Sequence, residues 1–292
     1  MIFWKTLDIS ERLQGIVLLV ITAVLWSSSG LFIKWIEWHP LAIAGARSAI
    51  AAIVIRIAFR HSPLSWNVSQ VSGAVAYAAA MLTFVAATKL TTAANAILLQ
   101  YTAPIYVAIL GALFLREKPQ LYDWLTIGLV ASGMVLFFQE QVSTGGMLGN
   151  LLAIISGICL AIMIVSLRQQ KDGCPSGSVF LGNILTFIIG LPFMFEGSPG
   201  IVGWGAIFGL GFFQLGLSYV LYTSAIKKTT ALEASIITII EPILNPIWVF
   251  LLIGEAPGGW SLVGGLVIVS AITGRYVLPA LKTPSKSQEI AR

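Results

Sequence analysis

Apolar residues fill long windows of the chain, and short polar segments separate one window from the next. A helix needs about 20 apolar residues to cross the roughly 30 Å hydrocarbon core of a bilayer, and each window has about that length. The windows begin near Leu13, Leu41, Val68, Ala93, Leu121, Met147, Gly177, Ile201, Thr230 and Gly259. We therefore predict an all-α integral membrane protein with ten transmembrane helices.

The charged residues indicate how these helices are oriented. Of the 17 lysines and arginines, 14 lie on every second connection, at Lys5, Arg12, Arg56, Arg60, Arg116, Lys118, Arg168, Lys171, Lys227, Lys228, Arg275, Lys282, Lys286 and Arg292. The remaining connections hold only Lys34 and Lys89. Because cytoplasmic loops carry the excess of positive charge, we predict a multi-pass protein of a bacterial-type inner (plasma) membrane with both termini in the cytoplasm.

The composition leaves little room for a soluble domain. Hydrophobic residues make up 57% of the chain and charged residues 10%, the mean hydropathy is +0.91, and ten spans use roughly 200 positions. The net charge of +5 comes from the cytoplasmic connections, where it faces anionic lipid headgroups. The expected surroundings are the lipid bilayer, and no nucleic-acid partner is predicted.

The chain contains an internal duplication. When it is shifted by 138 residues, positions 91–119 align with 229–257 without a gap, and ten of the 29 pairs are identical. The identical pairs include Pro104 with Pro242. The fourth predicted span therefore repeats as the ninth.

The repeating unit is five spans long. A weaker register pairs Gly15 with Gly149, so the first span repeats as the sixth. We predict a first five-helix repeat at residues 1–140 and a second at 141–292. Because five is odd, the second repeat must be inverted in the bilayer relative to the first. Inverted repeats are typical of secondary transporters, which bind substrate near the membrane midplane where the repeats meet.

Polar residues inside the predicted spans are candidates for a substrate site. Such groups are costly at bilayer depth and usually face a bundle interior or a water-filled path. Several occur at three- and four-residue spacing, which places them on one face of a helix. For each of them, packing or hydrogen bonding between helices is the alternative role. The predicted substrate-binding residues are Trp26, Ser29, Tyr77, Gln100, Tyr101, Gln214, Ser218, Glu241, Asn245 and Trp248.

Glu241 is the acidic residue near the middle of a predicted span. A carboxylate in apolar surroundings needs a partner or a proton. Glu241 could bind a substrate ammonium group, carry a coupled proton, or pair within the protein. Arg47, inside the second predicted span, is the candidate countercharge, with a structural ion pair or a side chain that reaches toward the membrane surface as the alternative.

Three prolines interrupt predicted spans, and Pro104, Pro242 and Pro246 are the predicted hinge or kink residues. Proline removes an intrahelical hydrogen bond and frees the carbonyl four residues earlier. Such a carbonyl at membrane depth must be satisfied by protein or by cavity water. Since Pro104 and Pro242 are equivalent in the duplication, they indicate the binding region and two points of bending; a static kink is the alternative.

The residue types that are missing from the predicted spans limit the range of possible substrates. Phosphate recognition calls for a cluster of lysines or arginines, and Arg47 is the one cation deep in a predicted span. A small zwitterion or a mostly apolar molecule fits better, because aromatic rings accept apolar groups or cations. The sequence holds no H-E-x-x-H and no P-loop motif. We predict no catalytic residues, no metal site, no cofactor and no use of ATP.

The segment "AVLWSSSGLFIKW", followed by Pro40 and "AGARSA", resembles the first two spans of EamA-type members of the drug/metabolite transporter superfamily. The segments "TAPIYVAILGALFLREKP" and "IEPILNPIWVFLLIGEAP" resemble the fourth and ninth spans of the same family. The resemblance covers essentially the whole chain. Within the family, the chain is most similar to YddG-type exporters of aromatic and other amino acids.

The resemblance implies a carrier that exports amino acids, aromatic ones included, by alternating access around a midplane cavity. An exporter of hydrophobic or cationic drugs, or of other small metabolites, is the alternative within transport. A membrane-embedded enzyme is the alternative of a different class, and a channel is disfavoured because rings of charge are scarce. The predicted ligand is an amino acid or a similar zwitterion. The sequence leaves the direction, the coupling ion and the oligomeric state open, a monomer included.

Overall fold

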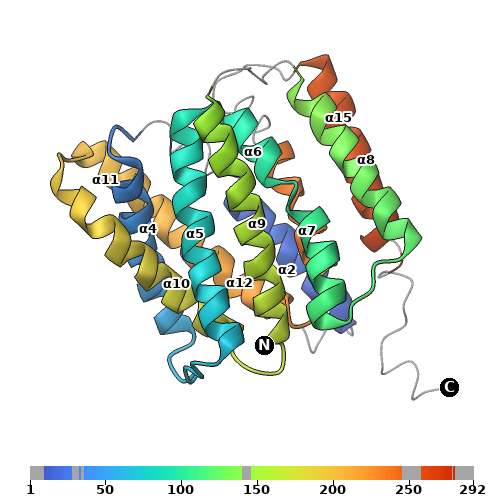
Figure 1. Cartoon of the computed structure of the whole chain (residues 1–292), viewed down its shortest axis with the longest axis horizontal. Coiled ribbons are helices and arrows are strands. Elements are labelled where there is room, and N and C mark those ends of the chain that lie inside the picture. Colours follow the sequence, from blue (N-terminus) through green and yellow to red (C-terminus); the bar gives the residue numbers. More distant parts are fainter. Residues whose placement is uncertain are drawn as a thin grey trace.

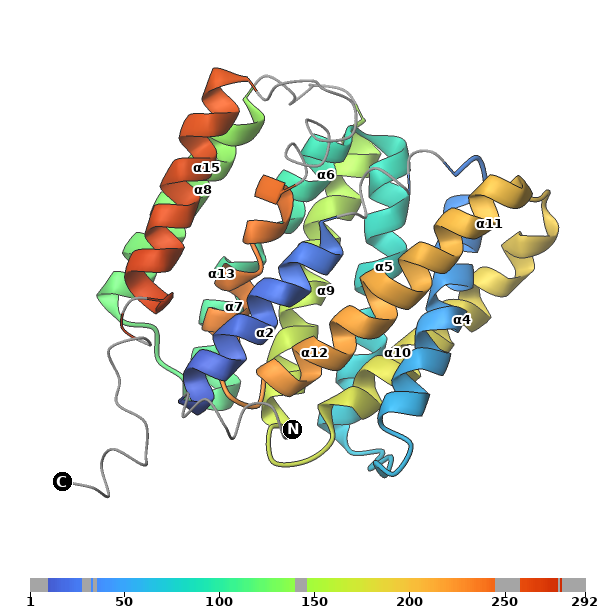
Figure 2. The ribbon, with the colours of Figure 1, turned by 180° about the vertical axis from the view of Figure 1, so that it is seen from behind.

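The computed structural model describes residues 10–27, 33, 36–139, 146–244, 258–277 and 279. Over these residues the chain is helical and holds no β-strand. The helices form one bundle, with α5 (Val68–Leu90) packed along α9 (Met147–Gln169) in its middle (Figure 1). Figure 2 shows the bundle from behind.

The predicted first repeat contains α2 (Glu11–Trp26), α4 (Pro40–Ala58), α5, α6 (Ala93–Gln100), α7 (Ala103–Leu110), the π-helix η1 (Gly111–Leu115) and α8 (Leu121–Phe138). The predicted second repeat contains α9, α10 (Pro175–Gly190), the 3₁₀ helix η2 (Leu191–Phe195), α11 (Gly200–Gly209), the π-helix η3 (Leu210–Leu217), α12 (Ser218–Ala225), α13 (Ala231–Ile237), α15 (Gly259–Ile272) and the π-helix η4 (Thr273–Val277). The helices that open the spans start within two residues of the predicted windows.

Seven helices are long and apolar enough to cross a membrane, counted over the described residues. They correspond to the second through the eighth predicted spans. The helices of the first and tenth spans have 16 and 14 described residues. In the ninth span, seven described residues form α13, and a further helical stretch covers 240–244. The all-helical fold with several membrane-length helices is therefore confirmed, whereas ten crossings and the location of the termini stay predictions.

Equivalent threonines begin the fourth and ninth spans. The side chain of Thr92 accepts a hydrogen bond from the backbone N–H of Asn95 at 3.0 Å. The side chain of Thr230 accepts one from the backbone N–H of Glu233 at 3.1 Å. Each threonine thus satisfies one of the free N–H groups at a helix start. The duplicated sequence therefore produces the same local structure twice.

The packing of the two predicted repeats is also duplicated. A Cβ atom on Gly15 of α2 would lie 2.7 Å from Cγ2 of Thr229, and one on Gly149 of α9 would lie 2.8 Å from Cβ of Thr91. Thr91 and Thr229 are equivalent in the duplication, as are the two glycines. In the same way, α2 packs on α12 and α9 packs on α5. Each repeat thus fits its first span against the other repeat.

Two lysines at equivalent positions of the duplication form hydrogen bonds at opposite ends of the bundle. Lys89, near the end of α5, donates a hydrogen bond to the carbonyl of Ile36 at 2.8 Å. Lys227, just after α12, donates one to the carbonyl of Gly173 at 2.7 Å. The ends of α5 and α12 lie at opposite ends of the bundle (Figure 2). Lys89 therefore has a local structural role on the side where cations are scarce.

The helices α8 and α15 pack closely through small residues and lie side by side at one edge of the bundle (Figures 1 and 2). A Cβ atom on Gly264 of α15 would lie 2.5 Å from the carbonyl oxygen of Gly133 of α8. Small residues let membrane helices approach closely enough for dense van der Waals packing. Gly264 therefore sets the distance between these two helices.

We expect Gly264→Ala to lower the melting temperature of the detergent-purified protein by several degrees. The added methyl group would meet backbone atoms that cannot move aside, and overpacking of this kind costs about 1–3 kcal/mol. Gly128→Ala in α8 is the matched control, because its Cβ would meet no atom within 4 Å and alanine favours helix more than glycine. Circular dichroism melting measures both variants, and an unchanged melting temperature for Gly264→Ala would contradict the packing argument.

Candidate functional site

The fourth span is broken near its middle. The helix α6 ends at Gln100 and α7 begins at Ala103, so Tyr101 and Thr102 lie between two helical pieces. Pro104 occupies the first turn of α7, where its missing N–H costs little. The backbone N–H of Ile105 bonds to the carbonyl of Thr102 at 3.0 Å. The predicted kink at Pro104 is thus an interruption of the helix.

The ninth span is broken at the equivalent place. The helix α13 ends at Ile237, a turn covers Thr238 and Ile239, and helical structure resumes before Pro242. The carbonyl of Thr238, which the proline ring cannot bond, accepts a hydrogen bond from the backbone N–H of Glu241 at 3.0 Å. The hydroxyl of Tyr101 lies 3.3 Å from the same carbonyl, but its single hydrogen is shared with the nearer oxygen of Glu241. The freed carbonyl is therefore bonded within its own span and lies against a hydroxyl of the opposite repeat.

A central cavity lies between the two breaks. Its volume is about 50 Å³, which exceeds the roughly 30 Å³ of one water molecule but is far below the about 300–1,000 Å³ of typical ligand pockets. In this structure the cavity is therefore smaller than a typical ligand pocket. It is lined from both predicted repeats by Trp26, Arg47, Met81, Phe84, Gln100, Tyr101, Ala103, Pro104, Leu160, Ile164, Gln214, Leu215, Tyr219, Ser235, Thr238 and Glu241.

Two opposite charges face this cavity. Arg47 of α4 is 1% exposed, and its Nη1 donates to Oε1 of Gln214 at 3.3 Å. Glu241 accepts a hydrogen bond from the hydroxyl of Tyr101, with 2.5 Å between the two oxygen atoms. A hydrogen bond to an ionised carboxylate is stronger than one between neutral groups. The cavity is thus lined by one basic and one acidic side chain inside an apolar bundle.

Aromatic rings line the cavity or pack next to the residues that line it. The indole N–H of Trp26 donates to Oγ of Ser218 at 2.8 Å, and the Trp26 ring lies 5.2 Å from that of Tyr219. Tyr77 packs edge-on against Tyr219 at 5.0 Å and donates its hydroxyl to Asn183 at 3.1 Å. Ser218 and Asn183 therefore fix the orientation of two rings near the cavity.

The predicted site residues fall into three groups. Trp26, Gln100, Tyr101, Pro104, Gln214 and Glu241 line the cavity. Tyr77, Ser218 and Pro242 are buried next to it and do not line it. Ser29, Asn245, Pro246 and Trp248 lie outside the described residues. Substrate contact stays a prediction for every one of them.

Tyr219 lines the cavity although the sequence pattern omits it. The regular spacing from Gln214 through Ser218 to Tyr222 predicts a face that excludes Tyr219. In the structure, Leu210–Leu217 forms the π-helix η3, whose i→i+5 bonding places more residues in each turn. The cavity is therefore lined by Gln214 and Tyr219, five residues apart. A pattern of polar residues at α-helical spacing gives no sign of such a segment.

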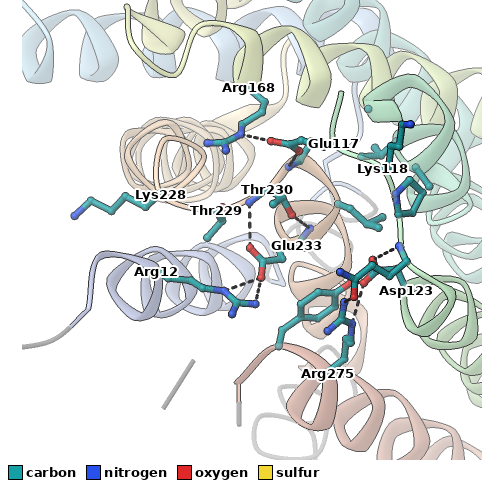
Figure 3. A pocket seen from close by; sticks show the side chains of 18 residues that line it. Arg12, Glu117, Lys118, Asp123, Arg168, Lys228, Thr229, Thr230, Glu233 and Arg275 are labelled. Carbon is teal, nitrogen blue, oxygen red and sulfur yellow. Dashed lines mark hydrogen bonds and ion pairs between the residues drawn. The ribbon is translucent and has the colours of Figure 1, made fainter. Parts of the chain in front are cut away.

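A second and larger space, here called the charged vestibule, opens at the end of the bundle that the charge pattern predicts to be cytoplasmic. Its volume is about 390 Å³. Each of its ion pairs joins one residue of segment 1–140 to one of segment 141–292 (Figure 3). The pairs are Arg12 with Glu233, Arg168 with Glu117 at 2.7 Å, and Arg275 with Asp123 at 2.9 Å.

The vestibule and the central cavity follow one another along the broken spans. On α7, Pro104 lines the cavity and Ala108, four residues later, lines the vestibule. On α13, Ser235 lines the cavity and Leu232 lines the vestibule. One turn of α-helix advances about 5.4 Å, so about one turn separates the two spaces. Among the described residues, no cluster of three His, Cys, Asp or Glu side chains could hold a metal ion.

The profile of the EamA-like transporter family matches the chain twice, over residues 13–139 and 147–276. This chain belongs to the EamA-like transporter family. The family predicted from the sequence is therefore confirmed, and the protein is a multi-pass membrane transporter with a small-molecule substrate. The two matches show that the EamA unit occurs twice in this chain.

Several curated relatives of this EamA protein are also transporters. An uncharacterized transporter of Archaeoglobus fulgidus is 28% identical over 65% of the chain and 69% of that protein. The pseudopaline exporter CntI of Pseudomonas aeruginosa is 26% identical over 61% of the chain and 64% of the exporter. Mouse solute carrier family 35 member G1 is 24% identical over 90% of the chain and 78% of the carrier.

A solved crystal structure shares the fold of this EamA protein. It superposes with a TM-score of 0.76 over 92% of this chain and 99% of the solved chain, at 16% identity. At that identity the likeness supports the fold alone.

We expect Tyr101→Phe to lower the melting temperature of the purified protein. The carboxylate of Glu241 would lose a 2.5 Å hydrogen bond, and bonds to charged groups contribute about 1.5–3 kcal/mol. Tyr106→Phe in α7 is the matched control, since no hydrogen bond of the Tyr106 hydroxyl joins it to a described residue. Differential scanning fluorimetry measures both variants. Equal melting temperatures would mean that the Tyr101 hydroxyl does not stabilise Glu241.

Proposed function

We propose that this protein is a secondary carrier that exports amino acids, aromatic ones included, by alternating access around the central cavity. The observation that carries the proposal is the pair of opposite charges, Arg47 and Glu241, facing one cavity between two broken spans. The sequence resemblance to YddG-type exporters supports the same substrate class. The rings of Trp26, Tyr101 and Tyr219 at the cavity suit apolar and aromatic side chains.

A zwitterion matches the charges better than an anion or a cation would. A phosphorylated metabolite would leave Glu241 facing a second negative charge, and among the described residues Arg47 is the one lysine or arginine that lines the cavity. A simple cation would meet Arg47 as a like charge. An amino acid carries both charges on one carbon, so each group can approach its opposite in a small space. Buried charges are stable only when they are paired.

The two repeats, residues 1–140 and 141–292, are proposed to be inverted and to move against each other. The duplicated contacts of Gly15 and Gly149 support inversion, because each repeat uses the same residues to meet the other. The charged vestibule supports entry from the cytoplasm, where both termini are placed by the charge pattern. The inner membrane is the proposed location. Outward transport is proposed from the YddG resemblance and from the similarity to the pseudopaline exporter CntI.

Export of hydrophobic cations is the second candidate. The observation in its favour is Glu241 beside aromatic rings, since a carboxylate and ring faces together attract organic cations. Arg47 weighs against it. A membrane-embedded enzyme is the rival of a different class, and the family match weighs against that reading.

We expect proteoliposomes that contain the protein to exchange labelled phenylalanine for unlabelled phenylalanine across the membrane. Counterflow needs no knowledge of the coupling ion, because exchange of substrate alone drives it. Empty liposomes and the same assay with a lipophilic cation as competitor are the controls. Competition by lipophilic cations without amino-acid counterflow would favour the second candidate, and product formation without flux would favour an enzyme. Repeating the assay with an imposed pH gradient shows whether protons are coupled.

We expect Arg168→Gln to make the vestibule end easier to open. The variant removes the ion pair to Glu117, which joins the two repeats, together with hydrogen bonds to the carbonyls of Ile226 and Lys227 within the second repeat. A partly exposed ion pair of this kind contributes about 0.5–1.5 kcal/mol. Ala108 lines the vestibule and is 2% exposed. A cysteine introduced there by Ala108→Cys should react with an impermeant maleimide about 2- to 10-fold faster in the Arg168→Gln protein than with Arg168 present.

The labelling experiments use a protein in which Cys159 and Cys174 are replaced by alanine, because both have free thiols that would also react with the maleimide. Inside-out vesicles present the predicted cytoplasmic end to the reagent. The control is Lys171→Gln, which removes a charge from an exposed connection of the same end. Equal labelling rates for the Arg168 and Lys171 variants would show that the ion pair does not restrain opening.

A further inference from the structure

We propose that Arg47 binds the carboxylate of the substrate, so that the carrier recognises molecules with a free carboxylate next to an ammonium group. The inference rests on the proposed function and specifies which protein group receives which end of the amino acid. It makes Arg47 the residue that separates amino acids from amines of the same shape.

The hydrogen bonding of Arg47 is incomplete. A guanidinium has five N–H donors, but Nη1 meets Oε1 of Gln214 only at 3.3 Å, and Nη2 meets the sulfur of Met81 at 3.9 Å. Nε is buried and has no hydrogen-bond partner among the described residues. The side chain therefore keeps donor capacity that its described neighbours do not use.

Because Arg47 is buried, its unused hydrogen-bond donors are energetically costly. The side chain is 1% exposed, and the three ion pairs between described residues all lie at the charged vestibule rather than at Arg47. Burying a cation is costly unless an anion pairs with it and accepts its hydrogens. A carboxylate is planar and accepts two parallel N–H groups from one guanidinium. Of the groups on an amino acid, the carboxylate fits Arg47.

A second lining residue of the same cavity, Glu241, suits the ammonium group. Glu241 lines the cavity with its carboxylate held by the hydroxyl of Tyr101. An α-ammonium group carries three donors and no acceptor, as a lysine ammonium does, so it complements carboxylate and hydroxyl oxygens. The apolar side chains of Met81 and Phe84, which also line the cavity, are left for the substrate side chain. The cavity thus fixes both charged ends of the ligand.

The first test compares ligands on the unaltered protein. Displacement of labelled phenylalanine from the detergent-purified full chain is measured with phenylalanine, phenylalaninamide and phenethylamine. The amide and the amine keep the ring and the ammonium group but lack the carboxylate. We expect both to bind at least about tenfold more weakly, because a hydrogen-bonded ion pair is lost. Displacement by the amide at the same concentration as phenylalanine would overturn the assignment of Arg47.

The second test changes the arginine. Arg47→Gln should weaken phenylalanine binding at least about tenfold and leave amide binding within about threefold, so that the preference for the carboxylate collapses. Arg47→Lys should keep part of the preference, since the charge remains and the bidentate geometry is lost. Arg56→Gln, which removes an arginine from the last turn of the same helix, should leave the preference unchanged.

The possible outcomes separate the two proposals. An equal loss of phenylalanine and amide binding in Arg47→Gln would mean a structural role and overturn the inference. The ligand series on the unaltered protein tests the carboxylate preference even where a variant fails to fold. Binding of phenylalanine with no carboxylate preference would overturn the inference and leave the proposed function standing. Absence of binding and counterflow for every amino acid would overturn both.

Discussion

A peptide group inside a bilayer must find its hydrogen bonds within the protein, and the rest of this structure depends on how two broken helices meet that requirement. Proline residues at equivalent positions interrupt the fourth and ninth spans. The freed carbonyl of Thr238 is bonded by the backbone N–H of Glu241 in its own span, and the hydroxyl of Tyr101 from the other repeat lies 3.3 Å from it. The two breaks thus meet where the repeats face each other, and the central cavity lies between them.

Charge is distributed along the bundle in two different ways. At the vestibule, cations and carboxylates of opposite repeats neutralise one another directly. At the centre, Arg47 and Glu241 line one cavity, and each has its own polar neighbours, Gln214 and Tyr101. Pairs at the rim join the repeats, whereas charges at the centre remain oriented toward a shared space. The same residue types thus form ion pairs between the repeats at the vestibule, whereas at the centre they line one cavity.

Much of the fold could be predicted from the sequence, because apolar length and duplication are local or repetitive signals. Pro104 and Pro242 indicated both breaks, and five of the ten predicted binding residues line the cavity. Tyr219 could not be predicted, since the π-helix η3 changes the helical phase and a polar pattern at α-helical spacing gives no sign of it. The partners of Arg12 and Arg275 lie more than 150 residues away, and a single sequence holds no signal for such pairs.

The spacing of the two spaces along α7 and α13 limits how far the protein has to move. About one turn of helix lies between the cavity and the vestibule. The two spaces would therefore join if the few side chains between them moved aside. The ion pairs at the vestibule join the two repeats there. Because dissolved salt screens partly exposed charges, these contacts between the repeats weaken as ionic strength rises.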